Sequence, residues 1–204
     1  KSTHDPKQVL QQSDVVVLAP PARYLRSTYS SIYHLIPEET LVVCGTKGFE
    51  EGTNLTTFQV LQDVNPTLRY WAIMSGPNFA HEIVRRLYTE TVIASGDISV
   101  AERSREVFKT DRFKLFITDD AIGVALGGSL KNPIAMIVGI IEGRQMGSNA
   151  SASLINKGLR EANRLAVVMG ADERTLYGLS GFADVQLSSK PPGRNFLAGF
   201  AIGQ

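Results

Sequence analysis

The stretch over residues 121–141 is apolar or small at almost every position and is interrupted once by strongly polar residues, at Lys131 and Asn132. Such a run is typical of a helix that packs on most of its circumference, where an ammonium group is rare. Because a buried, unpaired charge is costly, we expect Lys131 to reach a solvated cleft or to meet an anion. The alternative is a lysine that extends to the surface from the edge of a core helix. The run is long enough to span a membrane, but a Lys-Asn-Pro sequence at its centre argues against a span.

Polar and backbone-shaping residues follow three predicted strands. Pro20 comes after the first strand, Lys47 stands between Thr46 and Gly48 after the second, and residues 75–78 (Ser-Gly-Pro-Asn) end the third. Ligands of open parallel sheets bind beyond the carboxyl ends of the strands. Each turn alone fits ordinary turn chemistry, and Asn78 could equally cap the next helix. Three such turns at one rim favour a site, with the Lys47 cation pointing into it.

Two further groups lie near the end of the chain. Arg194, between Gly193 and Asn195, suits fork-like binding of a phosphate or carboxylate, although a solvated loop arginine is the alternative. Asp184 follows a glycine-rich turn and could cap a helix or accept a hydrogen bond from a substrate hydroxyl. We expect both residues to contribute to the same site as Lys131.

The elements that must position these groups change character along the chain. Short apolar runs that predict strands cover residues 15–19, 41–45, 70–75, 92–95 and 113–118. Predicted crossover helices lie between them, over residues 22–36, 79–87 and 99–108, and residues 49–64 predict a loop and a short helix. Continuous apolar strands alternating with helices indicate a mostly parallel sheet covered on both faces.

The strand pattern stops near residue 119. The remainder predicts helices over residues 121–142 and 150–169, followed by a short helix opened by Asp172. We therefore expect an α/β fold with two domains: a Rossmann-type sheet domain over residues 1–119 and a mostly α-helical domain over residues 120–204.

The composition excludes several classes of function. With 21 Lys and Arg against 20 Asp and Glu, the formal net charge is +1, and no basic surplus suggests nucleic acid as a partner. A single cysteine rules out an intramolecular disulfide framework, and three scattered histidines give no metal-site spacing. The lack of a visible signal peptide favours the cytoplasm.

The GxGxxG dinucleotide fingerprint is absent, because no two of the 18 glycines stand two positions apart. The chain also starts without Met and ends within a helical pattern. We therefore expect it to be the interior of a longer protein, with a glycine-rich strand–turn–helix before residue 1 and further residues after residue 204.

Six segments in collinear order resemble the NAD(P)-dependent glycerol-3-phosphate dehydrogenase family. They lie at residues 46–48, 75–80, 127–132, 148–150, 178–184 and 193–195. Each alone is weak, but together they are highly specific and span nearly the whole chain. The resemblance implies a Rossmann domain followed by a helical domain like that of 6-phosphogluconate dehydrogenase.

The resemblance also implies roles for individual residues. Lys131 matches the catalytic lysine that accepts the proton of the substrate alcohol, and Lys47 matches a second lysine near both nicotinamide and substrate. Positions that match substrate-binding residues are Lys47, Gly76, Asn78, Lys131, Asn132, Asp184, Gly193, Arg194 and Asn195. Positions that match residues beside the cofactor, NAD or NADP, are Pro20, Lys47, Ala80 and Arg194.

The implied reaction is hydride transfer between NAD(P) and the pair dihydroxyacetone phosphate and sn-glycerol 3-phosphate, carried out by a cytoplasmic homodimer. Two alternatives stay open. One is a related dehydrogenase acting on a β-hydroxy acid or a sugar acid, although the loop around Arg194 favours a phosphate. The other is a non-catalytic remnant, because a chain without the phosphate loop lacks the main contact with a dinucleotide.

Overall fold

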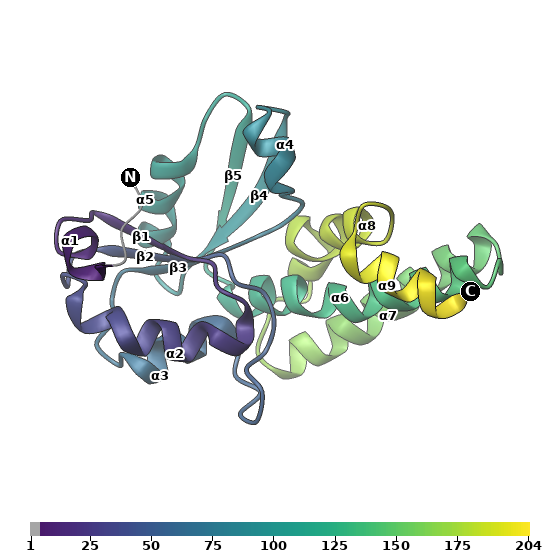
Figure 1. The fold of residues 1–204 in the computed structure, drawn as a ribbon, viewed down its shortest axis with the longest axis horizontal. Helices are drawn as coiled ribbons and strands as arrows, with labels where there is room; N and C mark the ends of the chain where they lie inside the picture. The colour runs from purple at the N-terminus through teal and green to yellow at the C-terminus, as the bar shows by residue number, and fades with distance from the viewer. Residues whose placement is uncertain (1–4) are drawn as a thin grey trace.

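The apolar runs in the first part of the chain form a five-stranded sheet in the computed structural model, which describes residues 5–204 (Figure 1). The spatial order is β1-β2-β3-β4-β5. The strands are β1 (Val15–Leu18), β2 (Leu41–Cys44), β3 (Trp71–Ser75), β4 (Thr89–Ala94) and β5 (Phe113–Thr118).

Three of the four strand pairs are parallel, which confirms the expectation of a mostly parallel sheet, and one pair is the exception. β1, β2 and β3 run parallel and so do β4 and β5, but β3 and β4 are antiparallel, with Ile73 opposite Ala94. The segment predicted as a crossover helix over residues 79–87 contains only α4 (Ala80–Val84), which is too short to return the chain across the sheet. The carboxyl ends of β1, β2 and β3 nevertheless share one rim, as the predicted site requires.

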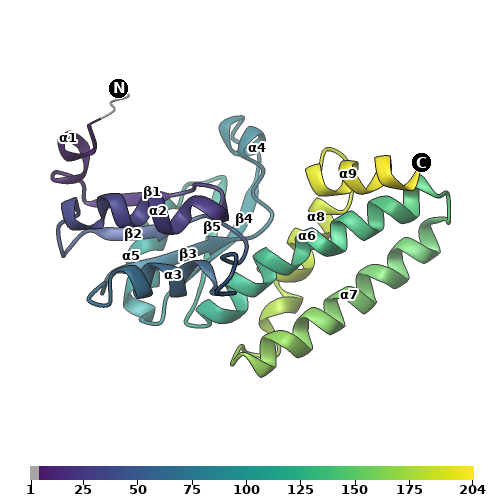
Figure 2. The same ribbon diagram turned by 60° about the horizontal axis from the view of Figure 1, so that its bottom comes forward.

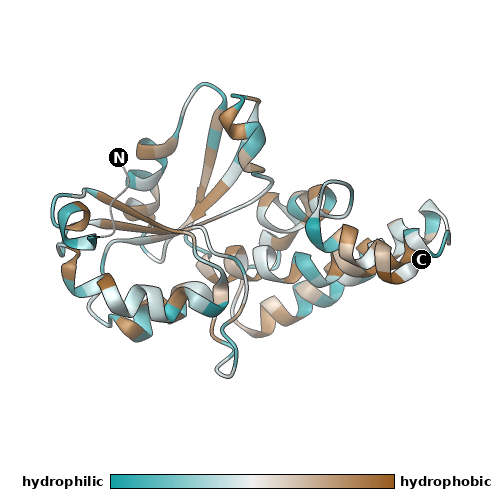
Figure 3. Ribbon diagram, in the orientation of Figure 1, coloured by the Kyte–Doolittle hydropathy of each residue, from teal (hydrophilic) through white to brown (hydrophobic). Residues whose placement is uncertain are grey.

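Helices cover both faces of the sheet, as its continuous apolar strands predict (Figures 1 and 3). One face packs against α2 (Ala22–Ile32) and α3 (Thr57–Val64), and the other against α5 (Ile98–Phe108). The predicted helix over residues 22–36 ends early and continues as a 3-10 turn, η1 (Tyr33–Leu35). A short helix that the sequence analysis did not predict, α1 (Pro6–Leu10), precedes β1.

The second part of the chain is helical, as predicted. It contains α6 (Ala121–Gly143), α7 (Ser148–Val168), a 3-10 turn η2 (Thr175–Tyr177), a π-helical turn η3 (Leu179–Ala183), α8 (Asp184–Ser188) and α9 (Arg194–Gly203). Figure 2 shows α6 running between α9 and α7, and it contacts both of them. The short helix expected at Asp172 is the η2 turn, which begins three residues later.

Helix α6 joins the two parts. Its first turns share the core of the sheet through Ala121, Val124 and Ala125, and its later turns pack among the other helices. The proposed domain division between residues 119 and 120 therefore stays a prediction, because one helix contributes to both cores.

The length and hydropathy of α6 would also suit a membrane span. However, 56% of its most apolar 18-residue window is buried inside the protein, which is typical of a core helix. Pro133 lies inside α6 without ending it, since the helix runs on for ten more residues to Gly143.

Candidate active site

A cavity of about 530 Å³ lies at the carboxyl-end rim of β1 and β2, against α6 and α9. Both parts of the chain contribute to it. Its lining includes six of the residues that the sequence analysis selected, namely Pro20, Lys47, Lys131, Asn132, Arg194 and Asn195. Residues from four separate segments therefore converge on one hollow, as expected of a ligand site in an open α/β sheet.

The Asp184 carboxylate bridges two lysines beside this cavity. Lys131 Nζ donates to Asp184 Oδ1 at 2.6 Å, and Lys47 Nζ donates to Asp184 Oδ2 at 2.6 Å. The exposed fraction is 1% for the Asp184 side chain, 12% for Lys131 and 18% for Lys47. Lys131 thus meets an anion and lines a cleft, which are the two expectations for it, and it does not extend to the outer surface.

The turn after β2 holds Lys47 in a fixed position. The Thr46 hydroxyl donates to Pro20 O at 2.7 Å, which ties the turns after β1 and β2 together, and Lys47 Nζ also donates to Gly76 O at 3.2 Å. Burial lowers the pKa of Lys47 to about 8; the Asp184 carboxylate opposes this shift and the Lys131 charge adds to it. Lys47 is therefore a cation at pH 7 that loses its proton more readily than an exposed lysine.

Asp184 is the first residue of α8 and follows the η3 turn. Asp184 does not cap α8, because no side-chain cap is found there; both of its carboxylate oxygens accept hydrogen bonds from lysines instead. A carboxylate this deeply buried needs compensating charges, and here two cations supply them. A role in substrate binding stays a prediction.

Arg194 and Asn195 begin α9. The residue before them, Gly193, has to be a glycine because an added Cβ there would collide with Ser188 O. Asn195 Nδ2 donates to Asn132 Oδ1 at 2.9 Å, which joins α9 to α6 next to Lys131. The Arg194 side chain is exposed and forms no ion pair with the described residues, so its guanidinium is available to an anion in the cavity.

The turn after β3 contributes less than expected. Gly76 offers its carbonyl oxygen to Lys47, and its φ of +148° together with the proximity of Thr91 explains the need for glycine. Asn78 is half-buried, Ala80 is exposed, and neither lines the cavity. No side chain caps α4, so Asn78 does not act as its cap. The contacts of Asn78 with substrate and of Ala80 with cofactor stay predictions.

Sequence reasoning missed how α6 meets its neighbours. Gly48 N donates to Ser129 Oγ at 3.0 Å, and the paired glycines before Ser129 allow close contacts with other segments. Two adjacent glycines inside an apolar helix signal a close approach of this kind. Among residues 5–204, no cluster of three or more His, Cys, Asp or Glu side chains could hold a metal ion.

The chain matches two models of one protein family. Residues 1–101 match the NAD-dependent glycerol-3-phosphate dehydrogenase N-terminus, and residues 120–204 match the NAD-dependent glycerol-3-phosphate dehydrogenase C-terminus. The earlier resemblance is thus confirmed on both sides of the predicted boundary.

Similar proteins carry the same name. The chain is 39% identical over 207 residues to glycerol-3-phosphate dehydrogenase (NAD(P)+) of Myxococcus xanthus, covering 100% of this chain and 62% of that protein. It is 40% identical over 197 residues to the protein of that name from Symbiobacterium thermophilum, covering 96% and 58%. The chain therefore spans about three-fifths of the length of these relatives.

A solved structure agrees. The crystal structure of glycerol-3-phosphate dehydrogenase from Coxiella burnetii superimposes with a TM-score of 0.91 at 33% sequence identity, covering 98% of this chain and 61% of that one. The expected fold class, a Rossmann-type sheet followed by a helical part, is confirmed. The chain belongs to the NAD-dependent glycerol-3-phosphate dehydrogenase family.

Proposed function

We propose that this chain contains the substrate site and the nicotinamide end of an enzyme that interconverts dihydroxyacetone phosphate and sn-glycerol 3-phosphate. The observation that carries the proposal is the convergence of Lys47, Lys131 and Arg194 on one cavity. Two of these cations are held by a buried carboxylate and the third is open to a ligand. A small substrate with a reactive oxygen at one end and a phosphate at the other fits this distribution of charge.

In this proposal Arg194 binds the phosphate. A guanidinium offers paired N–H donors that match two phosphate oxygens, and the charge-assisted hydrogen bonds are strong. Asn195, fixed by its hydrogen bond to Asn132, stands beside it. Binding the phosphate away from the reacting carbon would supply most of the orientation of the substrate.

In this proposal Lys131 donates the proton during reduction and accepts it during oxidation. During reduction, the substrate carbonyl oxygen gains negative charge, and an ammonium aimed at this oxygen stabilises the charge and donates a proton. An ammonium has three N–H groups, of which Asp184 occupies one on Lys131, so the others can face the cavity. In the oxidation direction the neutral amine of Lys131 would take the alcohol proton.

Lys47 supplies a second positive charge at the same oxygen. Its proton remains bound at pH 7 because its pKa is about 8. Together the two lysines would stabilise the negative charge that develops on the substrate oxygen during reduction.

The residues present fit the nicotinamide end of NAD or NADP, which supplies or takes the hydride when bound. The cavity extends from Pro20, in the turn after β1, to Lys131 on α6, and Lys47 and Arg194 also line it. Pro20, Lys47 and Arg194 would border the cofactor here, on the side where the strands of an open sheet end.

We propose in addition that the enzyme works in the cytoplasm as a homodimer. Light scattering of the full-length protein would check the dimer, and a species of monomer mass at micromolar concentration would contradict it.

The test of the proposed function is a substrate panel with the full-length protein. Dihydroxyacetone phosphate should oxidise NADH or NADPH, measured by the loss of absorbance, whereas unphosphorylated dihydroxyacetone should react poorly because Arg194 has no phosphate to bind. Equal rates with both ketones, or reduction of NAD(P)+ by a β-hydroxy acid in preference to sn-glycerol 3-phosphate, would contradict the proposal.

A further inference from the structure

The turn of α6 that precedes Lys131 touches three other segments. An added Cβ on Gly127 would lie 2.7 Å from Ser180 O, in the turn that leads to Asp184. An added Cβ on Gly128 would collide with Ser75 Oγ and would lie 3.3 Å from the Lys47 stem. Close packing therefore brings α6 against both segments that supply partners to the lysine pair.

Ser129 adds a directional contact to this packing. Its hydroxyl donates to Ala125 O at 2.7 Å and accepts from Gly48 N at 3.0 Å. The side chain is 6% exposed. Because the hydroxyl proton is committed to Ala125, a lone pair of the oxygen faces the Gly48 amide, and both partners fix the orientation of the side chain.

The two residues joined by this contact are neighbours of the two lysines. Ser129 lies two positions before Lys131 on α6, and Gly48 directly follows Lys47. Asp184 joins the lysines at their ammonium ends, and the hydrogen bond between Gly48 N and Ser129 Oγ joins the two segments that carry them. The relative position of the two ammonium groups is thus set by a contact at each end of the pair.

We propose that Ser129 is a positioning residue of this site, whose hydroxyl holds the Lys47 turn on α6 so that Lys47 and Lys131 face Asp184 and the cavity together. The inference rests on the proposed function for its kinetic consequence only. Loss of the hydroxyl would release the turn and leave the Gly48 amide without its partner. Lys47 would then become better solvated and its ammonium less well placed.

Ser104 provides a matched control. It is also a buried helical serine, and its hydroxyl donates to the carbonyl four residues earlier, Val100 O, at 2.7 Å. It lies on α5, outside the cavity, and no backbone N–H of the described residues donates to it. A Ser104→Ala variant therefore reproduces the loss of a buried hydroxyl without the contact to the Lys47 turn.

The experiment compares Ser129→Ala and Ser104→Ala in the full-length protein. We expect Ser129→Ala to lower kcat/KM for dihydroxyacetone phosphate about tenfold, the order of effect of losing one buried hydrogen bond. The titration midpoint of Lys47, measured by NMR of ¹⁵N-labelled lysine, should move upward from about 8. The groups around Lys47 that could contribute to this midpoint, Asp184, Lys131 and Arg194, are unchanged in both variants. Ser104→Ala should keep both values near those of the parent protein.

The inference is overturned if Ser129→Ala leaves both the rate and the midpoint unchanged, or if Ser104→Ala changes them equally. Should Ser129→Ala fail to fold, Ser129→Cys keeps the shape with a weaker acceptor and should give the same changes at smaller size. If the parent protein does not turn over the substrate, the proposed function fails, but the Lys47 midpoint still decides the role of Ser129.

Discussion

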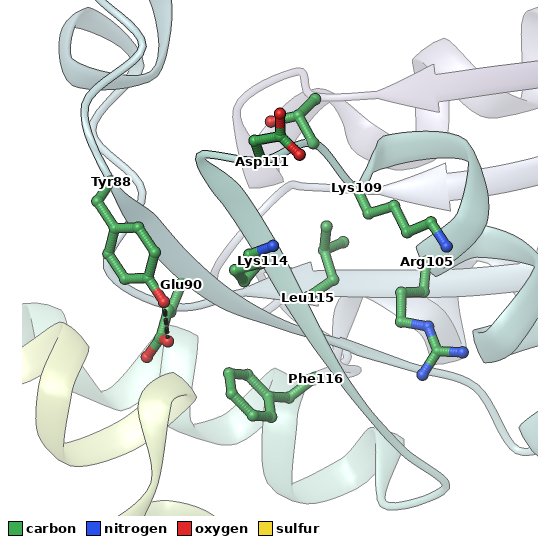
Figure 4. A pocket seen from close by; sticks show the side chains of 9 residues that line it. Tyr88, Glu90, Arg105, Lys109, Asp111, Lys114, Leu115 and Phe116 are labelled. Carbon is green, nitrogen blue, oxygen red and sulfur yellow. Dashed lines mark hydrogen bonds between the residues drawn. The ribbon is translucent and has the colours of Figure 1, made fainter.

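Two hollows of similar volume differ in whether their charged side chains are buried or exposed to solvent. The first, called the outer hollow, lies on β4, β5 and α5 and has a volume of about 620 Å³, against about 530 Å³ for the cavity at Lys131 (Figure 4). It is lined by Tyr88, Glu90, Arg105, Lys109, Thr110, Asp111, Lys114, Leu115 and Phe116. Its charged side chains lie in water: Lys109 and Arg105 pair with the exposed Glu106, and the Tyr88 hydroxyl donates to Glu90. Beside the cavity at Lys131, the carboxylate of Asp184 that bridges the two lysines is 1% exposed. Surface ion pairs contribute little to stability, whereas a buried charged group has to be compensated, so burial of charge distinguishes the proposed active site from the outer hollow better than volume does.

The two hollows also differ in the range of chain that builds them. Residues that line the outer hollow come from positions 88–116, whereas Lys47 and Asp184 are 137 residues apart in sequence. Bringing such distant groups within hydrogen-bond distance requires the whole fold. Matched substitutions in the two hollows can therefore test the comparison.

The largest effect is expected for Lys131→Met. Loss of the proposed proton donor should lower kcat for dihydroxyacetone phosphate by about 10³-fold or more, with little change in NADH affinity. Steady-state kinetics and NADH fluorescence titration measure the two quantities. Lys114→Met, in the outer hollow, is the control and should keep normal turnover. Near-normal kcat in Lys131→Met would remove this lysine from the chemistry.

Asp184→Asn should follow in size. Without the carboxylate charge, two largely buried ammonium groups lie close together with no anion between them, and we expect the free energy of unfolding to fall by about 3 kcal/mol. Urea denaturation of the full-length protein measures this loss. Asp111→Asn removes an exposed carboxylate of the outer hollow and should change stability very little. Equal stability of the two variants would show that the Asp184 bridge is dispensable.

Arg194→Ala should affect substrate binding in particular. We expect the KM for dihydroxyacetone phosphate to rise about 30-fold, as for the loss of a charge-assisted phosphate contact, while activity on unphosphorylated dihydroxyacetone stays the same. Arg105→Ala in the outer hollow should leave both unchanged. An unaltered KM in Arg194→Ala would assign the phosphate to another group.

The smallest predicted effect is the pH dependence set by Lys47. Because its pKa is about 8, its protonated fraction falls between pH 7 and pH 9, and kcat/KM for reduction should fall about tenfold over this range. Lys47→Arg keeps the charge throughout and should abolish this decrease, whereas Lys109→Arg should retain it. A decrease that persists unchanged in Lys47→Arg would belong to another group.

The same pKa has the opposite consequence for stability. The unfolded chain keeps Lys47 protonated up to its ordinary pKa of 10.5, whereas the folded protein releases the proton at about 8. The unfolded state therefore binds more protons between these values, and the contribution of Lys47 to the free energy of unfolding rises with pH across this window.

Local patterns predicted the strands and the leading site residue, but not the contacts between distant segments. Lys131 was recognisable because it interrupts an apolar helix. The antiparallel pairing of β3 with β4 was missed because strand direction depends on how the connection folds, and residues 79–87 provide only a five-residue helix.

Long-range pairing was also beyond the sequence. No local signal shows that Asp184 bridges both lysines, because its partners lie 53 and 137 residues away. Ser129 resembles the other small residues of α6 until the position of Gly48 is known. Patterns thus indicate which residues are unusual, and the fold decides what they contact.

The most direct test of the proposed active site at Lys47, Lys131 and Arg194 is a crystal structure of the full-length protein with NAD+ and sn-glycerol 3-phosphate. We expect the phosphate to accept hydrogen bonds from Arg194 at about 3 Å, and the carbinol oxygen to lie at a similar distance from Lys131 Nζ. A phosphate bound only in the outer hollow, or a Lys131 side chain turned away from the bound substrate, would contradict the account.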